Sequence, residues 1–200
     1  MELYRKSSGE PKRLAVFPGA FHPPTNAHLA LARAALAVCD EVLFVLPRVL
    51  PHKEYGRTGL QDRLELVLAA TAREPTFSVG VSQGGLFIEI ARECRAVYPA
   101  STRLFLLCGR DAAERIAGWD YGEPGAFARM LNEFELLVAR RGGAFEPAAE
   151  IREKVKVLPV GPEWEERSAT EVREKIARGE AWQHLVPAEI VDEVFRIYRQ

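Results

Sequence analysis

A short segment near the N-terminus constrains the fold of this chain more than any other. Residues 14–17 (LAVF) form an uninterrupted apolar run that ends in a Pro-Gly pair, and an Ala/Leu-rich stretch begins at Thr25 or Asn26 and extends to about residue 39. This pattern predicts a buried strand, a tight turn with a short loop, and then a helix. Gly19 lets the backbone come close to a ligand, and Thr25 is a favourable N-cap residue.

A helix that starts at this position would form an anion site. The first helical turn carries free N–H groups and about half a unit of positive charge. His28 lies in that turn, and His22 and Thr25 precede it. These three side chains are therefore candidates for contacts with a phosphate group. The alternative is that His28 is a partly exposed helix residue and that Thr25 only caps the helix.

Residues 19–28 (GAFHPPTNAH) resemble the G-x-F-x-P-x-[H/T]-x-G-H signature of the cytidylyltransferase-like nucleotidyltransferases. Those enzymes transfer a nucleoside monophosphate from a triphosphate to a phosphate-bearing acceptor. Ala27 stands where the signature has Gly, and His22 stands where Asp is common. The resemblance implies a catalytic set of His22, Thr25 and His28, and a nucleotide-binding set of Gly19, Ala20 and Phe21.

Residues 168–173 (SATEVR) open a second predicted helix, because Ser168 and Glu171 have the spacing of a capping box. The segment resembles the I-S-S-T-x-I-R motif of the same enzymes, in which hydroxyls and an arginine at a helix start hold the triphosphate. The resemblance implies nucleotide binding by Ser168 and Thr170 and a catalytic role for Arg173. Ala169 replaces one serine, so we expect a weaker clamp. The hypothesis requires both helix starts to face one polyphosphate.

Two further segments resemble bacterial nicotinate-nucleotide adenylyltransferases. Pro51-His52-Lys53 resembles their P-P-H-K loop, and Gly109 and Asp111 with Trp119 resemble their G-x-D…W segment. The resemblance implies that Asp111 meets the nucleotide sugar beside Gly109, and that the acceptor is bound by His52, Lys53 and Trp119, with the indole stacked on a pyridine ring. Those enzymes carry G-P-S-Y-T where residues 84–88 read GGLFI here. An apolar pair thus replaces a Tyr and a Thr near the acceptor.

Outside the motifs, short apolar runs alternate with longer helical stretches, which is typical of βαβ units and a parallel sheet. We expect an α/β fold: a Rossmann-like doubly wound parallel sheet with a helical C-terminus. Residues 13–200 are expected to form a single nucleotidyltransferase domain, and residues 1–12 a loose N-terminal extension. On the helix expected over residues 60–73, Leu64 and Leu68 are expected to face inward and Arg63 outward. The motif loops all follow strands at their carboxyl ends, where such folds bind ligands.

Bulk properties exclude several functional classes. A length of 200 residues suits one domain, and a net charge of −1 gives no electrostatic footprint for nucleic acid or an anionic membrane. The N-terminus has no apolar signal-peptide core, and no apolar run has the length of a bilayer span. The cysteines are odd in number and widely spaced, which predicts buried, reduced thiols in the cytoplasm. We expect small-molecule partners and no binding of nucleic acid or membrane; the sequence leaves the oligomeric state open.

The leading hypothesis is transfer of AMP from ATP to the phosphate of nicotinate or nicotinamide mononucleotide. The acceptor phosphate is already an anionic nucleophile, so the enzyme needs only to align and neutralise two polyanions. Mg²⁺ is expected to accompany ATP, without metal ligands from the protein. The alternatives are a pantetheine-phosphate adenylyltransferase, which also uses a T-N-G-H form, and a homologue that binds nucleotides without useful turnover. Length and charge balance disfavour a class I aminoacyl-tRNA synthetase.

Overall fold

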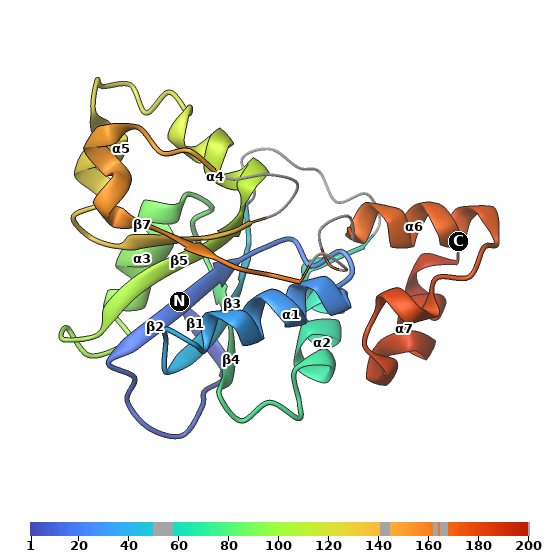
Figure 1. The fold of residues 1–200 in the computed structure, drawn as a ribbon. Helices are drawn as coiled ribbons and strands as arrows, with labels where there is room; N and C mark the ends of the chain where they lie inside the picture. Colours follow the sequence, from blue (N-terminus) through green and yellow to red (C-terminus); the bar gives the residue numbers. More distant parts are fainter. Residues whose placement is uncertain (50–57, 141–144, 162–163, 165–167, 200) are drawn as a thin grey trace.

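The computed structural model describes residues 1–49, 58–140, 145–161, 164 and 168–199. In these residues a seven-stranded sheet has the strand order β1-β4-β3-β2-β5-β6-β7 (Figure 1). All neighbouring strands are parallel except β1 and β4. The strands are β1 (Glu2–Arg5), β2 (Arg13–Pro18), β3 (Glu41–Pro47), β4 (Phe77–Ser82), β5 (Arg103–Gly109), β6 (Glu135–Ala139) and β7 (Val155–Leu158). The predicted doubly wound α/β sheet is confirmed.

Helices connect the parallel strands and cover both faces of the sheet (Figure 1). None of the helices in the described part of the chain combines the length and the apolar character needed to cross a bilayer. The α-helices are α1 (Asn26–Ala35), α2 (Leu60–Ala70), α3 (Phe87–Arg95), α4 (Arg110–Ala117), α5 (Ala126–Met130), α6 (Ala169–Arg178) and α7 (Val191–Tyr198). Short 3₁₀ segments are η1 (Ala149–Lys154), η3 (Gln183–Leu185) and η4 (Ala188–Ile190).

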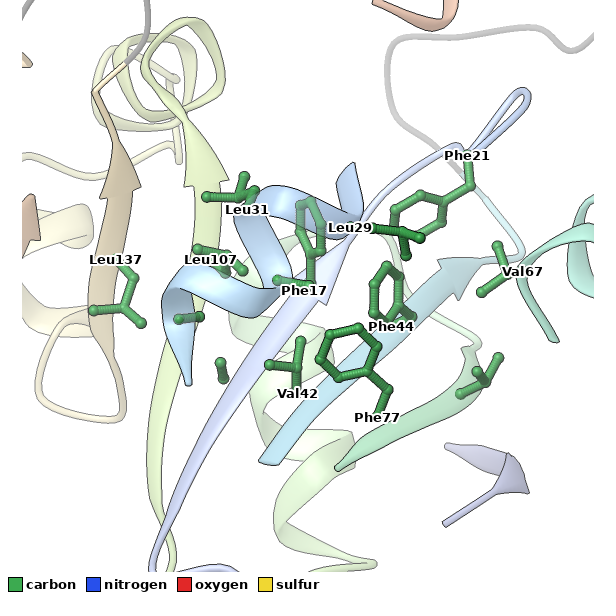
Figure 2. Packing of buried hydrophobic residues seen from close by; sticks show 14 of the residues in the cluster. Phe17, Phe21, Leu29, Leu31, Val42, Phe44, Val67, Phe77, Leu107 and Leu137 are labelled. Carbon is green, nitrogen blue, oxygen red and sulfur yellow. The ribbon is translucent and has the colours of Figure 1, made fainter. Parts of the chain in front are cut away.

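Successive residues of β2 point to opposite faces of the sheet, as the period of a strand requires. On the face that α1 covers, Phe17 packs among other aromatic rings (Figure 2). Phe21, from the loop after β2, joins this cluster: its ring centroid lies 5.4 Å from that of Phe17 and 5.3 Å from that of Phe44. The loop that carries the sequence signature is therefore anchored in the core.

A separate apolar cluster joins the C-terminal helices to α2. Leu66 of α2 packs with Val172 of α6 and Val194 of α7. The Asn26 side chain at the start of α1 donates hydrogen bonds to the carbonyl oxygens of His184 (3.0 Å) and Val186 (3.1 Å). The helical C-terminus is thus confirmed, and it is held close to the start of α1.

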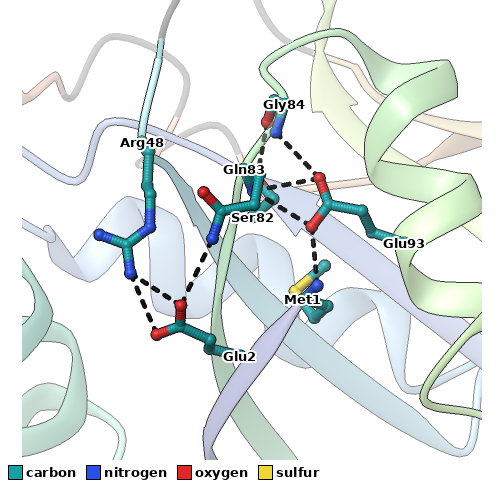
Figure 3. Close-up of polar contacts among 7 residues, drawn as sticks. All are labelled: Met1, Glu2, Arg48, Ser82, Gln83, Gly84 and Glu93. Atoms are coloured by element: carbon teal, nitrogen blue, oxygen red, sulfur yellow. Dashed lines mark hydrogen bonds and ion pairs between the residues drawn. The ribbon is translucent and has the colours of Figure 1, made fainter.

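Two sequence-based expectations about the fold are wrong. The N-terminal extension is not loose throughout, because Glu2–Arg5 forms β1 along the edge of β4. Figure 3 shows the polar contacts beside it: Glu2 accepts hydrogen bonds from Arg48 (2.9 Å) and Gln83 (3.3 Å), and the amino group of Met1 lies 2.8 Å from Glu93.

Arg63 does not face outward; it is 2% exposed. Its guanidinium is satisfied by backbone carbonyls, one of which lies 43 residues away.

Candidate active site

A cavity of about 750 Å³ lies at the carboxyl ends of β2 and β5. These two strands are neighbours at the centre of the sheet, and the chain proceeds outward from them in opposite directions. Such a reversal of strand order is where open α/β sheets bind ligands. Phe17 and Gly19 line the cavity after β2, and Cys108 and Gly109 line it at the end of β5.

The structure brings most of the predicted site residues to this cavity. Thr25 lies behind its wall and is 1% exposed. His52 and Lys53 lie outside the described residues. The predicted residues that line the cavity are Gly19, Ala20, Phe21, His22, His28, Gly109, Asp111, Trp119, Ser168, Thr170 and Arg173.

The start of α1 fixes the orientation of His28. Thr25 caps the helix, and its backbone N–H donates to His28 Nδ1 (3.0 Å). The Thr25 hydroxyl lies 2.8 Å from the same nitrogen. Because a backbone N–H can only donate, Nδ1 is an acceptor, and the proton of a neutral imidazole resides on Nε2. The capping contact therefore sets the tautomer of a histidine that lines the cavity.

The start of α6 reaches the same loop from the other end of the chain. Ser168 caps α6 by accepting a hydrogen bond from Glu171 N (3.1 Å). Arg173 donates to the His22 carbonyl oxygen (2.6 Å) and to Thr170 Oγ1 (3.1 Å). The expected convergence of two helix starts is therefore observed, since residues of both line one cavity.

The loop between β2 and α1 has little conformational freedom. Gly19 N–H donates to the Val45 carbonyl oxygen (3.0 Å). A Cβ at position 19 would lie 2.7 Å from Phe21 Cζ, so a larger residue would displace that ring. Phe21 itself has a φ of 46°, in the left-handed region that non-glycine residues rarely adopt. The glycine of the signature is required by the packing of the loop against its own phenylalanine.

One part of the cavity lining is apolar and aromatic. Gly85, Leu86 and Phe87 line it together with Trp119 and Tyr121. Trp119 is 38% exposed. The Tyr121 ring stacks on Phe127 with centroids 6.3 Å apart and an angle of 7° between the planes. A flat ring could therefore bind at this end against aromatic surface.

The electrostatic character of the cavity suits a polyanion. Asp111 is the single carboxylate among the described residues that line it, whereas four arginines contribute positive charge. Arg110, Arg115 and Arg140 were missed in the sequence, because arginines outside a motif carry no local signal of where a fold will place them. Burial raises the pKa of the Cys108 thiol to about 12, so this cavity residue stays neutral at physiological pH.

Fold, cavity and paired helix starts together define a nucleotidyltransferase of the cytidylyltransferase-like class. The family model described as cytidylyltransferase-like matches residues 16–175, and the chain belongs to this family. Its curated relatives include probable nicotinate-nucleotide adenylyltransferases. One from Thermus thermophilus is 31% identical over 94% of this chain and 100% of its own length. That of Gloeobacter violaceus is 30% identical over 92% of this chain and 94% of its own length.

Solved structures support the fold. The nicotinic acid mononucleotide adenylyltransferase of Plasmodium falciparum, complexed with APC, superimposes with a TM-score of 0.71 at 14% identity. The match covers 92% of this chain and 94% of the other. The same enzyme complexed with NaAD gives a TM-score of 0.69 at 15% identity, with coverages of 92% and 95%.

Proposed function

We propose that this chain transfers AMP from ATP to the phosphate of a pyridine mononucleotide, nicotinate mononucleotide in the first place, and releases pyrophosphate in a step of NAD biosynthesis. The observation that carries the proposal is the convergence of two helix starts, at Thr25 and Ser168, on one cavity with an aromatic end. The curated relatives, which span nearly the whole chain, support the reaction and the acceptor.

The polar end of the cavity would bind the triphosphate. Backbone N–H groups at the starts of α1 and α6 favour negative charge, and Arg173 adds a guanidinium. With its proton on Nε2, His28 can donate a hydrogen bond to a phosphate oxygen whose charge rises as the bond to pyrophosphate breaks. His22, Thr170 and Ser168 complete the set of groups that we assign to the nucleotide.

The acceptor would bind at the apolar end, with its ring against Trp119 and its phosphate directed at the α-phosphorus. The phosphate attacks in line, so one P–O bond forms as the bond to the departing pyrophosphate breaks. Asp111 is assigned to a ribose hydroxyl, since it is the one carboxylate among the described residues that line the cavity. The roles of His52 and Lys53 stay predictions.

We propose that Mg²⁺ arrives with ATP as part of the substrate. Within the described residues no group of three or more His, Cys, Asp or Glu side chains could hold a metal ion. The donor set of the cavity, one carboxylate among arginines and imidazoles, does not fit a cation held by the protein alone. The triphosphate oxygens would provide the ligands. We place the reaction in the cytoplasm, in keeping with three buried free thiols.

Pyrophosphate release from ATP and Mg²⁺ tests the proposal. Nicotinate mononucleotide, nicotinamide mononucleotide and 4′-phosphopantetheine are supplied in parallel, and the dinucleotide product is identified by mass spectrometry. We expect the highest kcat/KM with nicotinate mononucleotide. Pyrophosphate release with 4′-phosphopantetheine but with neither mononucleotide would contradict the assigned acceptor. ATP binding without release in any of the three reactions would contradict the enzyme and favour a nucleotide-binding homologue.

A further inference from the structure

Arg63 is a buried charged residue that the proposed mechanism does not use. It lies in the first turns of α2 and is 2% exposed. Its guanidinium donates hydrogen bonds to the carbonyl oxygens of Ala20 (2.9 Å) and Gly59 (3.3 Å). Ala20 lines the cavity and Arg63 does not, so Arg63 contacts the loop from outside the cavity. A fully buried guanidinium is costly unless its donors are satisfied in this way.

The carbonyl that Arg63 holds belongs to the least relaxed part of the site. The next residue, Phe21, has a φ of 46°, in the left-handed region that is unfavourable for a non-glycine residue. Arg173 holds the carbonyl oxygen on the other side, that of His22, at 2.6 Å. Two guanidiniums from two distant helices therefore flank the strained residue. Such a conformation persists only where its surroundings impose it.

We propose that Arg63 is a positioning residue for adenylyl transfer, which fixes the peptide between Ala20 and Phe21 in the orientation that the bound polyphosphate requires. This proposal rests on the proposed function. The peptide is trans, so its C=O and N–H groups point in opposite directions. With the carbonyl held toward α2, the Phe21 N–H is turned away from α2, and in this proposal it is the donor offered to the polyphosphate. Without Arg63 the peptide can rotate, and this donor is lost.

Arg5 provides a matched control at the other end of the same helix. Its guanidinium donates to the carbonyl oxygens of Leu68 (3.2 Å) and Phe77 (3.3 Å) and to the Thr71 hydroxyl (2.5 Å). It thus stabilises α2 through backbone carbonyls, as Arg63 does, but none of these three partners lines the cavity. Substitution of Arg5 should therefore show only the effect that the loss of such hydrogen bonds has on stability.

The experiment compares Arg63→Met with Arg5→Met. Urea denaturation gives the stability of each variant, and kcat and KM are measured for ATP and for nicotinate mononucleotide at a temperature where both are folded. We expect Arg63→Met to lower kcat by about 100-fold, the loss typical of a displacement of about 1 Å in a catalytic group. Its KM for the acceptor should change little. Arg5→Met should retain kcat within about threefold whatever its stability. Equal kcat values for the two variants would overturn the proposal.

A second variant and a binding measurement separate this proposal from the proposed function. Arg63→Lys keeps the charge but not the two-donor geometry of a guanidinium, so its kcat should fall between those of the parent and Arg63→Met. If Arg63→Met does not fold, a kcat for Arg63→Lys equal to that of the parent overturns the role. Calorimetric binding of a non-hydrolysable ATP analogue needs no turnover: we expect about tenfold weaker binding to either Arg63 variant. If the parent protein shows no activity but the Arg63 variants still bind the analogue more weakly than the parent does, the proposed reaction is rejected and the role of Arg63 in positioning the loop is retained.

Discussion

The two ends of the cavity differ in how they are built. The polyphosphate end (residues 19–28 and 168–173) is polar, and its parts hold one another across the chain: Arg173 bonds to His22, and Asn26 bonds to Val186. The acceptor end (residues 85–87 and 109–121) combines apolar and aromatic side chains with the charged Arg110, Asp111 and Arg115, and its first segment is held locally. Glu89 accepts hydrogen bonds from Gly85 N and Leu86 N, both at 3.0 Å.

Because of this difference, we assign the chemical step to the polyphosphate end and the specificity for the acceptor to the acceptor end. At the polyphosphate end, elements from distant parts of the chain position the site together, so few substitutions are tolerated there. At the acceptor end, backbone N–H groups of the turn before α3 donate to Glu89 and Glu93, so the side chains of the turn can change without disturbing the sheet. Phe87 and Ile88 stand there in place of the Tyr and Thr of the enzymes that the chain resembles. We therefore expect substitutions at the two ends to affect different kinetic constants.

The largest effect is expected at the polyphosphate end. His28→Ala should lower kcat by about two to three orders of magnitude, because it removes a donor that acts on charge developing in the transition state. His184→Ala is the matched control: its side chain is exposed and outside the cavity, and its backbone carbonyl still accepts from Asn26. Steady-state kinetics with both substrates measure the outcome. A rate within twofold of the parent would remove His28 from the mechanism.

At the acceptor end we expect a smaller effect on a different constant. Trp119→Ala should raise the KM for nicotinate mononucleotide about tenfold, since ring stacking contributes roughly 1–3 kcal/mol. The KM for ATP should stay within twofold, and Trp119→Phe should retain most of the affinity. Phe195→Ala is a control with a similarly exposed ring, 41% against 38%, away from the cavity. A loss of ATP affinity alone would contradict the stacking role.

The sequence predicts the polyphosphate end better than the acceptor end, for a physical reason. The start of a helix can be predicted from the local sequence: Thr25 and Ser168 are N-cap residues, and the periodic pattern of apolar residues after each of them predicts a helix. The structure confirms both helices and all six parallel strands of the sheet within a few residues. What brings the two starts together is the packing of α6 and α7 against α2, which could be inferred only from the resemblance to a family.

The sequence did not predict the position of residues whose contacts are with distant parts of the chain. Arginine is rarely buried, so Arg63 was expected to face solvent, and the carbonyl of Ala20 that binds it lies 43 residues away. The strand Glu2–Arg5 is short and polar, and it forms because β4 offers an unpaired edge. In both cases the deciding interaction is made with a group that no local pattern reveals.

Glu93, whose carboxylate binds the backbone of the turn before α3, predicts a pH dependence at the acceptor end. Burial alone would raise the pKa of Glu93, but the N–H groups of Gly84 and Gln83 and the amino group of Met1 together hold it below its usual value (Figure 3). A lowered pKa contributes stability above the unfolded value of 4.5, and this stability is lost as the pH falls through the folded value. Acidification should thus lower the free energy of unfolding and raise the acceptor KM before the ATP KM.

Glu93→Gln tests this assignment. The variant should lose roughly 1.5–3 kcal/mol of stability at neutral pH, the range for a hydrogen bond to a charged group, and most of the difference should vanish at low pH. Glu133→Gln is the control, because Glu133 accepts from Arg92 in an exposed ion pair, which contributes little. Urea denaturation as a function of pH measures both. A constant difference between Glu93→Gln and the parent at every pH would exclude the carboxylate as the cause.

The smallest expected effect is a gain at the polyphosphate end. Ala169 lines the cavity at the first position of α6, where similar enzymes carry a second serine. Ala169→Ser should tighten ATP binding by about two- to fivefold, the equivalent of one hydrogen bond of about 0.5–1 kcal/mol, and leave the acceptor KM unchanged. Ala177→Ser, in the last turn of the same helix and outside the cavity, controls for the change in helix propensity. If Ala169→Ser instead altered the acceptor KM, the start of α6 would belong to both substrates, and the separation of chemistry from specificity in this cavity would not hold.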